Sequence, residues 1–155
     1  MATTVTTSIV IQCPIEEVFA FVTDARNNTQ WQSTAGLQSI QQQPDEPVGV
    51  GTRITEVWTF MGIESSSTSE VTEYEPTKKY TRHTISGSSP IKQGSLRFES
   101  TADGTQVIAN IHVHAGGLFA IAEPLLANNL KSGFDKTLAA LRLLLEEQNH
   151  SLPTT

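Results

Sequence analysis

The longest regular pattern of apolar positions lies near the C-terminal end of the chain, over residues 124–148. Leucine and other apolar residues recur there at three- and four-residue steps, and most charged residues fall between them. That spacing predicts an amphipathic α-helix. Pro124 suits its first position, because the N–H that proline lacks has no helical partner there. At about 1.5 Å per residue the helix spans roughly 37 Å, enough to cross a small domain.

Before this helix the pattern changes to the alternation typical of β-strands. Pro14 opens a short helix after the first strand, and Thr23-Asp24 ends it or caps a second one that reaches Trp31. Short turns such as Asp103-Gly104 join most of the strands, so we expect an antiparallel meander with one apolar face against the long helix, an α+β fold. β-branched and aromatic residues predict strands at residues 5–12, 37–43, 52–61, 63–74, 79–85, 93–100 and 105–114.

Composition and charge fit one globular domain. The chain has 155 residues, of which 37% are hydrophobic and 17% charged, so we predict a single domain over residues 1–148 and a frayed tail over residues 149–155. The net charge of −6 and the lack of a cluster of Lys and Arg argue against nucleic-acid binding. No apolar run reaches about 18 residues, so we do not expect an integral membrane protein. The single Cys13 and the lack of a signal-peptide pattern favour a cytoplasmic location. We expect the protein to be a monomer or a homodimer.

The succession of these segments resembles the START-like, or helix-grip, superfamily (SRPBCC), and within it bacterial polyketide cyclase/dehydrase-type and lipid-transport-type proteins. The resemblance implies a curved seven-stranded antiparallel sheet around the long C-terminal helix, two short helices after the first strand, and a hydrophobic cavity between sheet and helix. It implies no single activity, because the superfamily includes cyclases, lipid carriers and hormone-binding proteins. The residues that carry it are Cys13-Pro14 to Asp24, Trp31, Gly51-Thr52-Arg53 to Gly62, Val71 to Pro76, Ser86-Gly87, Asp103-Gly104-Thr105, Gly116 to Phe119 and Glu123 to Leu126.

Glu56 is the residue that most suggests chemistry. It alternates with Ile54, Trp58 and Phe60 along the predicted strand 52–61, so its carboxylate enters the cavity if that face points inward. A carboxylate held there is suited to general acid or base work. If the opposite face points inward, Glu56 lies in solvent, and the alternation alone leaves both orientations open.

Tyr80 and Arg82 form a second candidate set, on one side of the predicted strand 79–85. Tyr80 could donate a hydrogen bond to a ligand carbonyl and Arg82 could hold a carboxylate, unless this side faces solvent. Gly133 lies near the apolar stripe of the long helix, where glycine costs about 0.5–1 kcal/mol relative to alanine. We therefore hypothesise that Gly133 leaves space for a ligand and that Gly133→Leu keeps the fold but loses ligand uptake. The other expected cavity residues are Ser67, Phe98, Ile111, Leu126, Leu130 and Phe134.

Other possible sites have little support in the sequence. His112 and His114 share one face of a strand, but zinc normally takes three or four protein ligands, and we expect both to face solvent. Cys13 fits a structural role better than a reactive one. Since there is also no glycine-rich phosphate motif and no Cys-x-x-Cys pair, we expect no metal and no cofactor.

Two functions follow from the implied cavity. The first is binding or carriage of a small hydrophobic molecule, such as a lipid or a polyketide. The alternative is a polyketide cyclase/dehydratase-type enzyme that uses Glu56 with Tyr80 or Arg82 as acid–base or polarising groups, because such chemistry needs only a shaped pocket and one or two positioned groups. A third class, a protein-interaction module, requires an exposed apolar patch.

Overall fold

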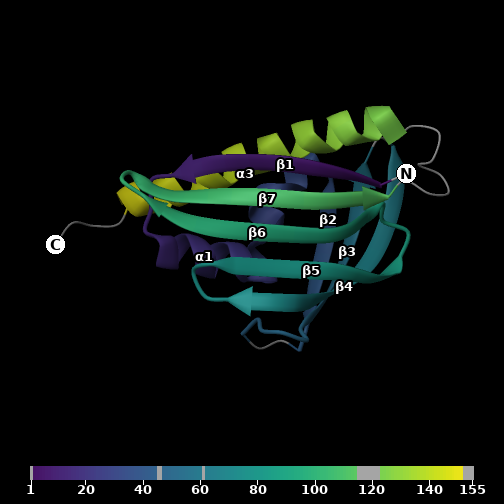
Figure 1. Ribbon diagram of the computed structural model, residues 1–155, viewed down its shortest axis with the longest axis horizontal. Helices are drawn as coiled ribbons and strands as arrows, with labels where there is room; N and C mark the ends of the chain where they lie inside the picture. Colours follow the sequence, from purple (N-terminus) through teal and green to yellow (C-terminus); the bar gives the residue numbers. More distant parts are fainter. Residues whose placement is uncertain (1, 45–46, 61, 115–122, 152–155) are drawn as a thin grey trace.

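The computed structural model describes residues 2–44, 47–60, 62–114 and 123–151. One antiparallel sheet of seven strands, in the order β1-β7-β6-β5-β4-β3-β2, curves around the long helix α3 (Figure 1). As predicted, the fold is α+β and of the helix-grip type, with the short helices between β1 and β2. The strands are β1 (Ala2–Ile11), β2 (Leu37–Gln43), β3 (Arg53–Phe60), β4 (Ile63–Glu75), β5 (Lys79–Gly87), β6 (Ile91–Thr101) and β7 (Gly104–His114). The helices are α1 (Ile15–Thr23), η1 (Ala25–Asn27), α2 (Thr29–Gln32), η2 (Ser33–Ala35) and α3 (Glu123–Ser151).

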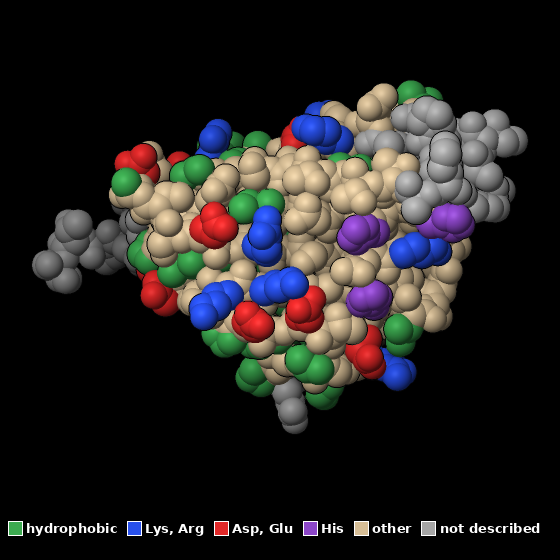
Figure 2. All heavy atoms as spheres, in the orientation of Figure 1, with side chains coloured by type: hydrophobic (Ala, Val, Ile, Leu, Met, Phe, Trp, Pro, Cys, Tyr) green, Lys and Arg blue, Asp and Glu red, His purple; other side chains and the backbone are tan. Residues whose placement is uncertain are grey.

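The two faces of the sheet differ as the alternation predicts. Along β7, Val107, Ala109, Ile111 and Val113 are buried on the inner face, whereas His112 is exposed. The outer face carries dispersed charged side chains of both signs and histidines (Figure 2). A sheet covered on one side only shows this pattern, and it places every interior site on the concave side, under the helices.

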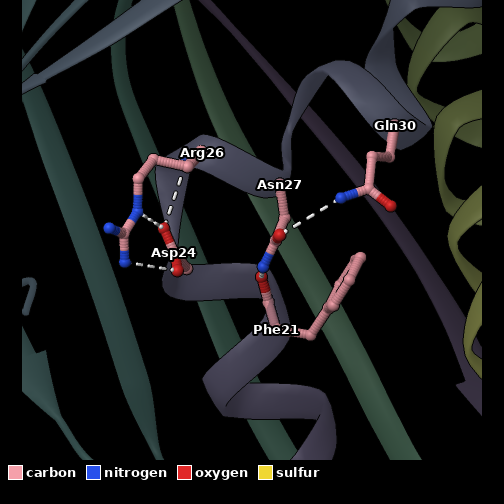
Figure 3. A network of polar contacts seen from close by, with 5 residues as sticks. All are labelled: Phe21, Asp24, Arg26, Asn27 and Gln30. Atoms are coloured by element: carbon pink, nitrogen blue, oxygen red, sulfur yellow. Dashed lines mark hydrogen bonds and ion pairs between the residues drawn. The ribbon is translucent and has the colours of Figure 1, made fainter.

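Side-chain hydrogen bonds hold the connection between α1 and α2 (Figure 3). The Arg26 guanidinium lies 2.9 Å from the Asp24 carboxylate, which also accepts from the Arg26 backbone N–H at 3.1 Å. The Asn27 amide donates to the Phe21 carbonyl and accepts from the Gln30 amide, both at 3.2 Å. Because short helices gain little stability of their own, these contacts help to hold the connection in one conformation.

A glycine ends this connection. Gly36 has φ +115°, and a Cβ there would collide with the backbone oxygen of Thr59. The Thr59 N–H in turn donates to the Gly36 carbonyl at 2.9 Å. Only glycine combines this backbone conformation with so close an approach, so the start of β2 is tied directly to β3.

The core lies between α3, α1 and the sheet. The buried side chains of α3 fall at three- and four-residue steps, as expected for an amphipathic helix, and include Leu130, Thr137, Leu138, Leu141 and Leu145. Each fully buried leucine stabilises the fold by roughly 1.5–3 kcal/mol. Within the described residues, no helix combines the length and the apolar composition needed to cross a membrane.

Several predicted boundaries differ from the observed ones. α3 continues to Ser151, so residues 149–151, which we predicted as part of a frayed tail, are helical. The physical reason is that the four residues between Gln148 and Pro153 include no glycine or proline that would end the helix. β6 begins at Ile91, two residues before the predicted start at 93. Met61, Gly116-Gly117 and residues 152–155 lie outside the described residues.

Candidate functional site

A cavity of about 110 Å³ lies between the inner face of the sheet, α2 and α3. Apolar side chains form much of its wall, among them Val22, Leu96, Ile111, Phe134 and Leu138. One water molecule needs about 10–15 Å³ of a volume measured in this way. The cavity therefore has room for a molecule of roughly ten non-hydrogen atoms. Long-chain lipids are considerably larger than that.

β3 turns the face that carries Glu56 toward this cavity. Ile54 is fully buried, Glu56 is only 6% exposed and Trp58 is half-buried, whereas Arg53 and Thr55 on the other face are exposed. The orientation that the sequence left open is therefore the inward one, and a carboxylate enters a mainly apolar space.

Glu56 is held by two partners. Its Oε1 lies 3.0 Å from Nη2 of Arg82, and its Oε2 accepts a hydrogen bond of 3.0 Å from the Trp58 indole N–H. The ion pair reaches from β3 to β5 across β4, whose cavity-lining residues there are Ser67 and Ser69. These small side chains leave room for the arginine to pass over them.

The environment keeps Arg82 charged and Tyr80 neutral. Burial alone would lower the pKa of Arg82, but the interactions with Glu56 and Tyr80 together outweigh burial, and the pKa lies above its ordinary value. Burial raises the pKa of Tyr80, against the opposing charge of Arg82, so its phenol stays protonated near neutral pH. The cavity thus contains an ion pair and a neutral phenol on neighbouring strands.

Four buried polar atoms, all in residues that line the cavity, have no hydrogen-bond partner among the described residues. They are Nη1 of Arg82, the indole nitrogen of Trp31, and the side-chain oxygens of Asn28 and Gln32. Asn28, Trp31 and Gln32 are 5%, 5% and 8% exposed. Leaving such a group unpaired costs about 1–3 kcal/mol, so a bound water or ligand that supplies the missing partners would stabilise these residues.

A second, smaller cavity of about 40 Å³ adjoins the first and shares Trp58, Ser89, Ile91 and Phe134 with it. Leu130 and Gly133 of α3 form part of its wall, and no charged residue lines it. A Cβ on Gly133 would meet only the Cβ of Ala35, at 4.0 Å. The glycine therefore leaves open space at this place instead of allowing a tight contact.

Most of the predicted cavity residues lie together, but not all. Glu56, Trp58, Ser67, Tyr80, Arg82, Ile111 and Phe134 line the larger cavity, and Leu130 and Gly133 line the smaller one. Ile54 and Phe98 face inward but belong to the larger core cluster instead. Phe98 packs edge-to-face on Phe19 of α1, with ring centroids 5.0 Å apart, so α1 covers that end of the sheet. The side chains of Phe60 and Leu126 lie outside the described ones.

The residues on α2 are the part of the site that the sequence analysis missed. Asn28 and Gln32 are four positions apart and Trp31 lies between them, so all three share one side of the short helix. The available signal was Trp31 at the end of the predicted helix, with Asn28 three residues before it and Gln32 directly after it. Thr137 and Leu138 of α3 also line the cavity.

The remaining candidates have structural positions. His112 and His114 are exposed, and His112 Nδ1 lies 3.2 Å from the Thr4 hydroxyl. No group of three His, Cys, Asp or Glu side chains suited to a metal ion occurs in the part of the chain that the structure describes. Cys13 is buried, and its Sγ lies 3.4 Å from the Leu145 carbonyl. Burial, together with Glu17 and Glu146, raises the pKa of this thiol.

The sequence matches the family described as polyketide cyclase / dehydrase and lipid transport over residues 2–146. The chain belongs to this family. Its members are linked to hydrophobic ligands or to cyclase activity, as the description of the family indicates. No curated protein matches the sequence.

Several solved structures of other proteins share this fold. A START superfamily protein from Mycobacterium smegmatis has a TM-score of 0.77 at 11% identity, over 94% of this chain and 98% of that one. A protein of Thermus thermophilus has a TM-score of 0.75 at 18% identity, over 90% and 94% of the two chains. The di-domain ARO/CYC StfQ from the steffimycin biosynthetic pathway has a TM-score of 0.77 at 12% identity, over 97% of this chain and 53% of that one.

Proposed function

We propose that this member of the family binds a small hydrophobic molecule in the larger cavity, between the sheet, α2 and α3. The observation that carries the proposal is an apolar cavity with buried polar groups that have no partner among the described residues. Such a combination is typical of ligand sites, where a mainly apolar wall supplies affinity and a few polar groups orient the ligand. The cytoplasm as location, the monomer or homodimer, and the single domain over residues 1–148 stay predictions.

Both tryptophans of the chain line this cavity, so tryptophan fluorescence reports on its contents. We would purify the protein, record native mass spectra, and identify any molecule released by denaturing extraction. The refolded protein is then titrated with each released molecule while tryptophan emission is followed. Saturable changes support the proposal, and a weaker response in Gly133→Leu, which fills the smaller cavity, would support the hypothesis that the ligand extends into that space. If nothing is released and a panel of small hydrophobic molecules leaves the emission unchanged, the proposal fails.

A second candidate function is that of a polyketide cyclase/dehydratase-type enzyme. The observation in its favour is that Arg82 and the protonated Tyr80 line the same cavity from one strand, and that Nη1 of Arg82 has no hydrogen-bond partner among the described residues. Both could donate to a ketone oxygen and favour the enol form of the substrate. Glu56 is less suited to act as the base, because each of its oxygens already accepts a hydrogen bond. Turnover of a polyketone that Arg82→Met abolishes, with binding retained, would favour this candidate over simple carriage.

A further inference from the structure

We propose that Trp58 sets the length of the ligand, because its indole closes the passage between the larger and the smaller cavity. This inference rests on the proposed function, since it specifies how much of the interior a bound molecule can occupy. Three features support it: the order of the two cavities along the fold, the contacts that hold the Trp58 side chain, and the sizes of the two cavities.

The two cavities follow one another along β3 and β4. Glu56 lines the larger cavity, and Trp58, two residues further along the same face of β3, lines both cavities. On β4, Ser67 lies opposite Glu56 and lines the larger cavity. Ser65 lies opposite Trp58 and lines the smaller one. The border between the two cavities therefore crosses the sheet at the level of Trp58.

The long helix shows the same order from the other side. Thr137 and Leu138 line the larger cavity. Phe134, one turn earlier in α3, lines both cavities, and Leu130, one turn earlier again, lines the smaller one. Trp58 from the sheet and Phe134 from the helix thus lie at the same border, with the two largest rings among the side chains that the cavities share.

The indole of Trp58 is held in place by a buried ion pair. Its N–H donates to Oε2 of Glu56 at 3.0 Å, and Oε1 of Glu56 lies 3.0 Å from Nη2 of Arg82. Through Glu56 the indole is connected to β5 as well as to its own strand. A ligand that pushed the indole aside would break its hydrogen bond to a buried carboxylate, and such a loss is costly. The passage therefore stays closed to a ligand that gains only a few additional apolar contacts.

The sizes of the two cavities decide which molecules can test this closure. The larger cavity, of about 110 Å³, takes roughly ten non-hydrogen atoms, and the smaller one, of about 40 Å³, adds roughly three or four. Octanol fits into the larger cavity alone, whereas dodecanol needs the volume of both. The hypothesis that Gly133 leaves space for the ligand then applies only to molecules that pass Trp58.

The test is calorimetric titration of the full chain with hexanol, octanol and dodecanol, each below its solubility limit. Every methylene group that becomes buried should tighten binding by about fourfold. In the wild type we expect this gain from hexanol to octanol but no gain from octanol to dodecanol. In Trp58→Ala, dodecanol should bind at least about tenfold more tightly than octanol.

Two outcomes in the wild type separate this inference from the proposed function. Dodecanol that binds the wild type at least about tenfold more tightly than octanol would overturn the role of Trp58 and leave the proposed function intact. If none of the three alcohols binds the wild type, both are overturned.

Trp31→Ala is the matched control, because Trp58→Ala enlarges the interior simply by removing an indole. Trp31 lines the larger cavity and is not among the described residues around the smaller one. Gly133→Leu, which fills the smaller cavity, is then added to each variant. It should weaken dodecanol binding at least about tenfold in Trp58→Ala and leave it unchanged in Trp31→Ala. Equal effects in the two backgrounds would refute the closure by Trp58.

Gly133→Leu alone keeps the inference testable if Trp31→Ala does not unfold cooperatively in urea. Because Trp58 separates the smaller cavity from the larger one, this variant should bind octanol as tightly as the wild type does. Octanol binding that is at least about tenfold weaker in Gly133→Leu would show that the two cavities are already joined, and would overturn the inference.

Discussion

Replacing Gly133 with alanine should stabilise the protein. Gly133 lies inside α3, where alanine is favoured over glycine by about 0.5–1 kcal/mol because glycine loses more backbone freedom on folding. The new methyl group would meet only the Cβ of Ala35, at an ordinary contact distance of 4.0 Å. No packing term therefore opposes the helical preference, and we expect the free energy of unfolding to rise by about 0.5–1 kcal/mol. For a chain of this size the melting temperature should rise by about 1–4 °C.

The assay is urea unfolding followed by far-UV circular dichroism, on protein refolded from denaturant so that no co-purified ligand contributes. Gly36→Ala is the matched control, because its methyl group would collide with the Thr59 backbone and its φ is +115°. That variant should be destabilised instead. If Gly133→Ala is less stable than the wild type, or equally stable, the space beside Gly133 cannot accept a methyl group without cost. The conclusion that Gly133 borders open space would then be wrong.

Three further predictions concern the core, the ion pair and the thiol. Leu141→Ala should lower the free energy of unfolding by about 2–5 kcal/mol, because Leu141 is fully buried. Leu143 is 64% exposed, so Leu143→Ala should change this free energy by less than about 0.5 kcal/mol. Equal effects of the two substitutions in urea unfolding would contradict the assigned buried face of α3. Glu56→Ala should cost about 3–5 kcal/mol, since it leaves the Arg82 charge uncompensated, and a loss below about 1 kcal/mol would mean that the pair is not buried as described. The raised pKa of Cys13 predicts a contribution to stability that is complete below about pH 8.5 and declines as the pH rises toward the pKa of this thiol in the folded protein. Cys13→Ala should remove this decline in the free energy of unfolding. Identical pH profiles of the variant and the wild type in urea unfolding would refute the prediction.

The fold could be predicted from the sequence because its patterns are local. The strands alternate with period two, since only one face of the sheet is covered, and α3 has one buried stripe. The end of α3 was less predictable, because no glycine or proline between Gln148 and Ser151 marks where the helix stops.

The site was predictable in part for the same reason. Alternation places Glu56 and Trp58 on one face, but it does not say how far along the sheet α1 reaches. Phe98 therefore looked like a cavity residue although α1 covers it. The pairing of Glu56 with Arg82 across β4 depends on strand order and on the shift of register between Val71 and Glu73, which are properties of the assembled sheet.

The pairing of β1 with β7 has a consequence for how the chain folds. Ala2 lies opposite His114 and Ile11 opposite Thr105, so every contact of this ladder joins residues far apart in the sequence. The hairpins from β3 to β7 close over short loops and can form early, whereas β1 has no strand partner until β7 has been synthesised. Contacts of such long sequence separation slow folding, because the entropy of the intervening chain is lost before they form. We expect the sheet to be completed last at the edge where the chain begins.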